Sequence, residues 1–363
     1  MSRIDLSAAS STNLPQQISA VVHEQLASSA TPGATIALLL DGQPTLIEGI
    51  GFRDREHTTA LNAHAQFYIY SVTKSLIATA VLQCVERNAI ALDAPIQTYL
   101  PETPLPAPVT VRQLLNHTGG LPDYGGLPAY RAALQAHPTQ PWRSDEFLAV
   151  ISQQGLRFAP GKGWGYSNLG FLLLRLLLES ITATSLGVVL RKQLFAPLDL
   201  RQTFVAQSQV DAQRLTPGYS SSLSADGAIQ DVRPLYHPGW VAHGVVASTA
   251  PELARIIDAI CAGPLLGPAS RAAMLEPVRV PTTHPCFQQP SYGLGLMIDP
   301  RSRYGMLAGH GGGGPGYSAG AVHLPNVRGH RVTSVALANS DQDDLSLRIA
   351  FTLAMLLADT LGD

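Results

Sequence analysis

The sequence has few charged residues, no basic run and almost no lysine. Of its 363 residues 14% are charged, and the formal net charge is −2. A chain without a basic run has little with which to neutralise phosphates, so we expect neither nucleic acid nor a membrane as a partner. Only three of the 24 basic residues are lysines, namely Lys74, Lys162 and Lys192. Because an amine can lose its proton and a guanidinium cannot, a retained lysine is a candidate for proton transfer.

Cysteine is also scarce. Cys84, Cys261 and Cys286 are far apart, and no pair has the spacing of a zinc site or a redox motif. We therefore predict three free thiols in buried packing positions, no disulfide framework and no metal or other cofactor.

Long apolar runs are missing as well. The most apolar stretch, residues 172–178, is interrupted by Arg175 and is too short to cross a bilayer. No apolar run follows Arg3, so no signal peptide is visible, and we expect a cytoplasmic protein. A periplasmic location stays open if the sequence has been trimmed at a processing site.

The order of the expected elements indicates the fold class. Apolar periodicity predicts helices at residues 15–28, 72–87, 170–181, 251–261 and 343–361. Short apolar runs predict strands at residues 34–40, 45–50, 292–298, 304–307, 320–324 and 332–338. With strands at both ends, the pattern favours an α/β (α+β) fold, in which helices flank one antiparallel sheet and a mainly helical region is inserted. We assign residues 1–66 and 240–363 to the sheet domain and residues 67–239 to the helical domain.

A Ser-x-x-Lys pattern, Ser71 to Lys74, stands at the start of one expected helix. This spacing places the amine one turn above the hydroxyl on the same face of the helix. The helix N-terminus directs N–H groups and a positive dipole end at the same point, which suits a developing oxyanion. If its surroundings lower the pKa of Lys74, the neutral amine can take the serine proton. The alternative is a helix-capping Ser71 beside a solvated Lys74.

Two further segments carry polar groups that could take part in catalysis or substrate binding. Tyr166 and Asn168 follow a Pro-Gly turn that can present a phenol and an amide together, although a buried tyrosine and a helix cap would look alike. His310 lies within a glycine-rich run, residues 309–316, where the absence of side chains lets another backbone approach. A flexible surface turn is the alternative there.

Together these segments resemble the serine β-lactamase and penicillin-binding-protein superfamily. The order Ser-x-x-Lys, then Tyr-x-Asn, then a His-x-Gly triplet is most similar to the class C β-lactamase-like group, which includes DD-carboxypeptidases, D-aminopeptidases and esterases. Residues 110–122, 246–250 and 292–295 also resemble that group, and the likeness covers roughly residues 15 to 360.

The resemblance implies an active site between the two domains and a role for each matching residue. Ser71 corresponds to the nucleophile, Lys74 to the acylation base or its electrostatic partner, and Tyr166 to the proton shuttle. Asn168, His310, Gly312 and Gly313 correspond to substrate-binding positions, and the N–H groups of Ser71 and Gly313 to the oxyanion hole. The implied function is a serine hydrolase that acts on small esters or amides through an acyl-enzyme.

Histidine replaces lysine at position 310, and this change bears on the substrate. A lysine there would meet a β-lactam carboxylate as a permanent cation, whereas an ordinary histidine is mostly neutral above its pKa. We therefore expect poor β-lactam hydrolysis at about pH 7.5 and better affinity near about pH 6. His117 is expected to be a structural histidine. His243 could line the pocket, but a core or surface position is favoured.

Other functions remain open on the sequence alone. Residues 316–320 match the G-x-S-x-G nucleophile elbow around Ser318, but a strand is expected where that motif requires a helix, so we interpret the match as coincidental. A DD-peptidase, a β-lactamase or a slowly acylating sensor would carry the same motifs. The acyl group, a transacylase activity and the oligomeric state are also left open.

Overall fold

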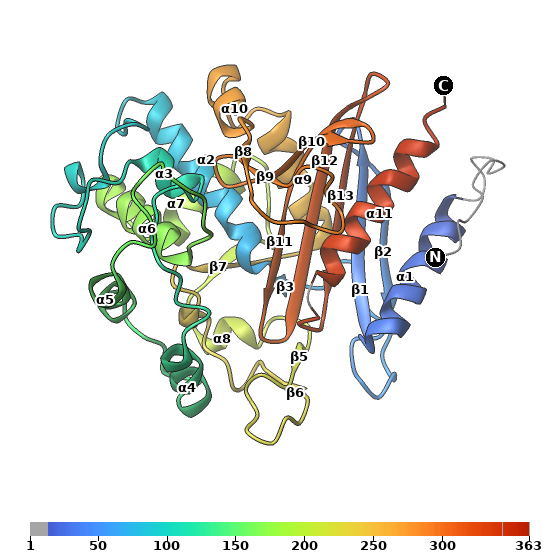
Figure 1. The fold of residues 1–363 in the computed structure, drawn as a ribbon. Helices are drawn as coiled ribbons and strands as arrows, with labels where there is room; N and C mark the ends of the chain where they lie inside the picture. Colours follow the sequence, from blue (N-terminus) through green and yellow to red (C-terminus); the bar gives the residue numbers. More distant parts are fainter. Residues whose placement is uncertain (1–13, 343, 363) are drawn as a thin grey trace.

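The computed structural model describes residues 14–342 and 344–362 and has one large sheet at its centre. The strands of this sheet are β1 (Gly33–Leu40), β2 (Gln43–Gly51), β8 (Val278–Arg279), β9 (Ser291–Tyr292), β10 (Met297–Ser302), β11 (Gly305–Gly314), β12 (Tyr317–Val327) and β13 (His330–Ala338). They form an antiparallel sheet in the order β2-β1-β13-β12-β11-β10-β9-β8 (Figure 1). This is the large antiparallel sheet that the sequence predicts.

The N-terminal hairpin enters the sheet through a pairing of the two chain ends. Strand β1 pairs with β13 from Ala34 opposite Ala338 to Leu40 opposite Val332. Strand β1 lies inside the sheet, where both of its faces are covered. A strand in that position needs apolar side chains on both faces, and the sequence of β1 is apolar without alternation. The predicted single sheet built from both ends of the chain is confirmed.

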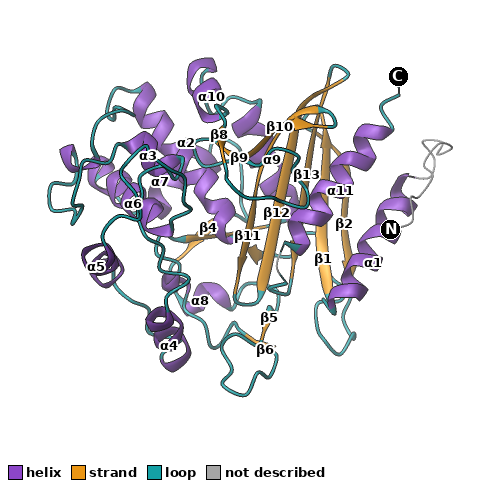
Figure 2. Ribbon diagram, in the orientation of Figure 1, coloured by secondary structure: helices purple, strands orange, loops and turns teal. Residues whose placement is uncertain are grey.

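Helices cover both faces of the sheet (Figure 2). On one face lie α1 (Leu14–Ser29) and α11 (Leu345–Asp359), which pack on each other and, with the sheet, enclose one apolar core. On the other face α9 (Ala250–Cys261) contacts β1, β12 and β13. Helix α9 begins where predicted, because the Thr249 hydroxyl caps it by accepting a hydrogen bond from the Glu252 N–H.

The inserted region is mainly helical. Its longer helices are α2 (Thr73–Glu86), α4 (Pro128–Ala136), α5 (Ser144–Gln154) and α6 (Asn168–Thr182). The shorter elements are α3 (Val111–Leu115), α7 (Leu186–Leu190), α8 (Gln209–Ala212) and, after the insertion, α10 (Pro268–Met274). A small sheet of β3 (Phe67–Tyr68), β7 (Val245–Ser248) and β4 (Phe204–Ala206) joins the two regions. One apolar core runs from the sheet into α2 and α6, and the domain limits at residues 66/67 and 239/240 stay a prediction.

The structure corrects two expected strands. Residues 292–298 do not form one strand, because the chain turns at residues 293–296 between β9 and β10. The glycine-rich run, for which the apolar pattern predicted no strand, forms the second half of β11 and pairs with β12 as far as Gly314. The structure therefore excludes a flexible surface turn at the glycines.

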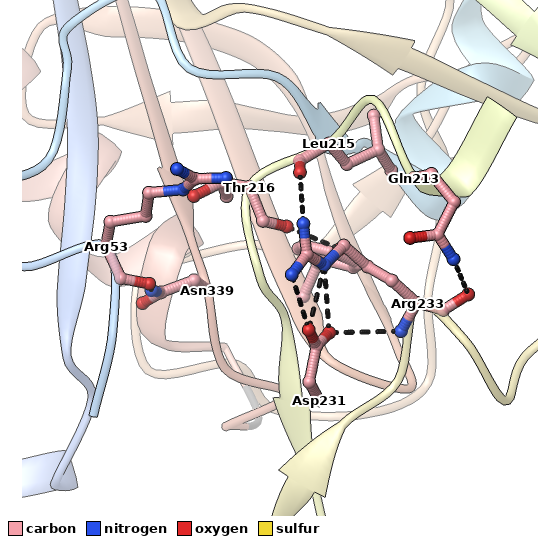
Figure 3. A network of polar contacts seen from close by, with 8 residues as sticks. Arg53, Gln213, Leu215, Thr216, Asp231, Arg233 and Asn339 are labelled. Atoms are coloured by element: carbon pink, nitrogen blue, oxygen red, sulfur yellow. Dashed lines mark hydrogen bonds and ion pairs between the residues drawn. The ribbon is translucent and has the colours of Figure 1, made fainter. Parts of the chain in front are cut away.

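A polar network secures the turn between β11 and β12 (Figure 3). Asp231 and Arg233 form an ion pair at 2.6 Å, and the same guanidinium donates to the Leu215 carbonyl. The neighbouring Thr216 carbonyl accepts a hydrogen bond from the buried Tyr317 hydroxyl at 2.8 Å. Tyr317 begins β12, so the network fixes the strand pair that carries the glycines.

Among the described residues, no single helix is long and apolar enough to span a bilayer. Helix α6 and the bent stretch Leu186–Phe195 would reach that length and apolarity only in combination.

The turn between β9 and β10 provides a test of the packing on α2. Gly295 has a φ of +78°, and a Cβ there would lie 2.4 Å from the Ala78 Cβ. Gly295→Ala should lower the free energy of unfolding by at least about 2 kcal/mol, since strain and overpacking add. Gly227 has a similar φ of +75° with nothing within 4 Å, so Gly227→Ala should cost only the strain, about 1 kcal/mol. Equal losses in denaturant unfolding would contradict the proposed packing.

Candidate active site

Ser71 lies in a short 3₁₀ turn, η2 (Tyr70–Val72), that leads into α2. Tyr70, directly before it, has a φ of +40°, a left-handed conformation that is strained for a bulky side chain. Burial of the Tyr70 ring and a hydrogen bond from its hydroxyl to the Pro315 carbonyl hold this conformation in place. The strained turn leaves Ser71 half-buried at the helix entrance.

Lys74 is fully buried and hydrogen-bonded, which excludes the alternative of a solvated first-turn lysine. Its Nζ lies 2.9 Å from the Ser71 Oγ and 2.7 Å from the Asn168 Oδ1. The Lys74 Nζ also lies over two aromatic rings, 4.9 Å from the centre of the Tyr166 ring and 5.7 Å from that of Phe171. The structure thus brings Ser71, Lys74, Tyr166 and Asn168 together.

The loop before α6 delivers Tyr166 and Asn168. The Ser167 hydroxyl caps α6 by accepting from the Gly170 N–H, and the Asn168 N–H donates to the Asp123 carboxylate at 2.7 Å. His117 accepts a hydrogen bond from the Ser167 N–H at 3.2 Å. Its ring packs on Tyr166 with centroids 4.4 Å apart, so His117 has the structural role that was predicted.

Burial tunes the lysine toward proton acceptance. Desolvation lowers the pKa of Lys74 to about 7, and the nearby Asp123 carboxylate opposes that shift. An amine with a pKa near neutrality is populated in its neutral form at physiological pH and can accept the Ser71 proton.

Burial has the opposite consequence for the phenol. Desolvation raises the pKa of Tyr166 well above its ordinary value, and a contact with the Ser71 hydroxyl offsets part of that rise. Tyr166 is therefore a neutral phenol near pH 7, able to donate a proton and unsuited to start as the base. Of the two candidates, Lys74 is the better proton acceptor.

The glycines of β11 bring this strand against the Ser71 turn. A Cβ on Gly312 would lie 2.3 Å from the Ile69 carbonyl, so the backbone that approaches Gly312 belongs to the protein itself. Gly313 has no atom within 4 Å of its Cβ position. In the described chain β10 pairs with β11 only as far as Gly309, which leaves residues 310–314 facing the Ser71 turn. Gly313 lies on this edge and lines the same cavities as Ser71.

His310 differs from the prediction made for it. It is 2% exposed, its Nδ1 donates to the Gly311 carbonyl, and its Nε2 accepts from the Tyr292 hydroxyl at 2.8 Å. Burial lowers the pKa of His310 to about 3, so the ring stays neutral at pH 6. The predicted gain in β-lactam affinity near pH 6 assumed an ordinary, titrating histidine, and the buried His310 does not meet that premise.

Two other residues bear on the sequence interpretation. Ser318 lies within β12 and is bonded to the Ser346 hydroxyl, so no helix follows it and the nucleophile-elbow match is coincidental, as predicted. For His243 the sequence favoured a core or surface position and left a pocket position as the alternative; its Nε2 lies 3.3 Å from the Lys74 Nζ and the ring lines a cavity beside Ser71. The only sequence signal for this position was a histidine in an otherwise apolar stretch.

Two cavities adjoin Ser71. One of 330 Å³ is lined by Ser71, Tyr166, His310, Gly313 and Asp341 among others. The other, of 370 Å³, shares Ser71, Gly313 and Asp341 and is also lined by the aromatic rings of Tyr70, Tyr124, Tyr130, Tyr236 and Trp240. A larger cavity of 1050 Å³ is lined by Trp164 and the loop of residues 278–290, and Ser71 is not part of its lining. Among the residues that the structure describes, no cluster fits a metal ion.

The fold is that of the β-lactamase-like serine hydrolases. A family model described as Beta-lactamase matches residues 18–359. The chain therefore belongs to the β-lactamase family, which confirms the resemblance of its motifs.

Individual relatives are distant. Penicillin-binding protein 4* of Bacillus subtilis (strain 168) is 25% identical over 304 residues, covering 81% of this chain and 65% of that protein. Esterase EstB of Burkholderia gladioli is 28% identical over 283 residues, covering 69% of this chain and 71% of that protein. The crystal structure of a D-stereospecific amidohydrolase from Streptomyces sp. superposes with a TM-score of 0.76 at 27% identity and covers 92% of this chain and 98% of that one. The chain spans 55% to 65% of the length of the first curated relatives it matches.

The pKa of Lys74 sets the expected pH dependence. Activity that requires the neutral amine should fall as the pH drops below about 7, and by roughly tenfold per unit well below the pKa. Lys74→Arg should be nearly as damaging as Lys74→Ala, because arginine keeps its proton. Ester hydrolysis followed from pH 5 to pH 9 measures both effects. Retention of more than roughly a tenth of the activity in Lys74→Arg would make Lys74 an electrostatic partner and not a base.

Proposed function

We propose that this protein hydrolyses small amides or esters through an acyl-enzyme formed on Ser71. The observation that carries the proposal is the 2.9 Å contact between the Ser71 hydroxyl and a buried amine whose pKa is about 7. Nucleophilic catalysis by serine needs an adjacent base within hydrogen-bond reach, and Lys74 meets that geometry.

The geometry supports a simple sequence of proton transfers. Lys74 takes the Ser71 proton as Oγ attacks the carbonyl carbon, and the N–H groups of Ser71 and Gly313 stabilise the oxyanion. Tyr166 donates its proton to the leaving nitrogen or oxygen as that bond breaks, and Lys74 then returns a proton to Tyr166. In the second half a water molecule attacks the acyl carbon, and its proton restores the Ser71 hydroxyl through the same groups.

Charge in the two cavities favours one class of substrate. Asp341 lines both cavities, and neither lining includes a lysine or an arginine among the described residues. His310 stays neutral, so no cation at this position meets a substrate carboxylate. A β-lactam or a peptide with a terminal carboxylate is disfavoured, and a substrate with a free ammonium group is favoured.

Shape and relatives point the same way. The 370 Å³ cavity presents tyrosine and tryptophan rings, which suit an apolar or aromatic side chain next to the scissile carbonyl. A Streptomyces protein with a similar fold is a D-stereospecific amidohydrolase, and EstB is an esterase. We therefore propose amides or esters of amino acids with an apolar side chain, the D-enantiomers first.

The position of the acyl group tests the mechanism. Ser71→Ala should remove turnover with little change in unfolding, whereas Ser318→Ala should leave most of it. Mass spectrometry after treatment with a fluorophosphonate should find the adduct on the peptide that contains Ser71. An adduct on the Ser318 peptide would refute the mechanism.

A substrate panel tests the substrate class. The amide of D-phenylalanine should be hydrolysed with a kcat/KM at least about tenfold higher than its N-acetyl derivative, because acetylation removes the ammonium charge. Asp341→Asn should reduce this preference and leave hydrolysis of p-nitrophenyl acetate nearly unchanged. Rapid hydrolysis of nitrocefin, or a single burst of acylation without turnover on every substrate, would favour a β-lactamase or a sensor instead.

A further inference from the structure

The third polar neighbour of the Lys74 amine is His243, a residue without a part in the mechanism above. The ring is 1% exposed, and its Nε2 lies 3.3 Å from the Lys74 Nζ. It also lines the 370 Å³ cavity together with Ser71 and Asn168. A buried polar ring at this distance from the base can control where the hydrogens of that base point.

The segment that carries His243 is tied to the helix that carries Lys74. The Ala242 N–H donates to the Tyr124 hydroxyl at 3.0 Å, and the Val246 N–H donates to the Thr73 hydroxyl at 3.1 Å. Gly244, between them, has a φ of +86° that turns the chain into β7. The ring edge packs against Phe171 with centroids 6.4 Å apart. These contacts hold the imidazole in place beside the amine.

The imidazole is neutral in this setting. Burial is the main cause that lowers the pKa of His243, and the Lys74 charge lowers it further. The other charged or titratable groups around Lys74 and His243 are Arg175, His310, His117, Asp123 and Tyr166. A neutral imidazole carries one N–H, so its Nε2 either accepts a hydrogen bond from Lys74 or donates one to it.

The two tautomers of His243 leave different groups of Lys74 available to Ser71, and among the described residues the buried His243 Nδ1 has no hydrogen-bond partner that fixes the choice. A neutral amine has two N–H groups and one lone pair, and the Asn168 Oδ1 accepts one of those N–H groups. If the His243 Nε2 accepts the other, the lone pair is left for the Ser71 hydroxyl. If the His243 Nε2 donates, it occupies the lone pair and leaves Ser71 facing an N–H that cannot take its proton.

We propose that His243 is a positioning residue that accepts an N–H of Lys74 and thereby directs the lysine lone pair at the Ser71 hydroxyl. The proposal rests on the proposed function of Ser71 and Lys74. The same tautomer serves after proton transfer, because the ammonium has three N–H groups and finds acceptors in Asn168, Ser71 and His243. No histidine proton moves during the reaction.

Two substitutions separate an acceptor from a space-filling role. His243→Leu keeps an apolar side chain in place but removes the acceptor, so the plateau rate of Ser71 labelling should fall at least about tenfold. The Lys74 ammonium also loses a hydrogen bond, so the acidic limb of the pH profile should move to lower pH. His243→Gln places an amide oxygen within reach of the Lys74 Nζ and should restore the rate to within about threefold with the limb unmoved.

The measurement is the rate of fluorophosphonate labelling of Ser71 in the full chain from pH 5 to pH 9, with thermal unfolding of each variant. His323→Leu is the matched control, since His323 is also a buried neutral histidine but lies in β12, bonded to Thr333. His323→Leu should leave the acidic limb of the pH profile and the plateau rate of Ser71 labelling unchanged, even if the stability of the variant falls.

The possible outcomes are distinct. The proposal would be overturned if His243→Leu kept the plateau rate of Ser71 labelling or the position of the acidic limb. It would also be overturned if a folded His243→Gln variant were labelled no faster than His243→Leu. If His243→Leu does not fold, the His243→Gln profile decides the matter by itself, because a folded variant with a slow plateau rejects the acceptor role. Labelling that persists in Ser71→Ala would instead refute the proposed function and not the role of His243 alone.

Discussion

The site depends on the exclusion of water from one amine. Lys74 is fully buried, and desolvation holds its pKa at about 7 in spite of the Asp123 carboxylate nearby. In water the same amine would be protonated and useless as a base at neutral pH. Phe171, Tyr166 and the apolar core under α2 and α6 supply that dry environment. Under the proposed mechanism, the reactivity of Ser71 therefore depends on the packing around Lys74 as much as on the two residues themselves.

A second constraint is the close approach of β11 to the turn that holds Ser71. Any side chain on Gly312 would collide with the Ile69 carbonyl, and a side chain on Gly314 would collide with the Tyr70 ring. The glycines thus let one strand edge lie directly against the strained entrance of α2. A strand that approaches so closely is within reach of an oxyanion on Ser71, and this supports the proposal that the Gly313 N–H belongs to the oxyanion hole.

The histidines around the site share a common physical state. His117, His243 and His310 are all buried, and burial lowers the pKa of each. They contribute fixed hydrogen bonds rather than charge: His117 holds the Ser167 backbone, and His310 links Tyr292 to the Gly311 carbonyl. The pH dependence assigned here to Lys74 is therefore not complicated by a histidine that titrates near neutrality beside it.

Much of the fold and part of the site could be predicted from the sequence. Apolar periodicity determined the helices α1, α2, α6, α9 and α11 to within a few residues, because one buried face at helical spacing is a local signal. The Ser-x-x-Lys spacing determined that Ser71 and Lys74 share a helical face, which local geometry alone guarantees. Only the tertiary structure decided the pairing of β1 with β13, the turn within residues 292–298 and the place of the glycines inside a strand. It also decided the neutrality of His310 and the position of His243 beside Lys74, since burial and contacts between residues 169 positions apart depend on how the whole chain packs.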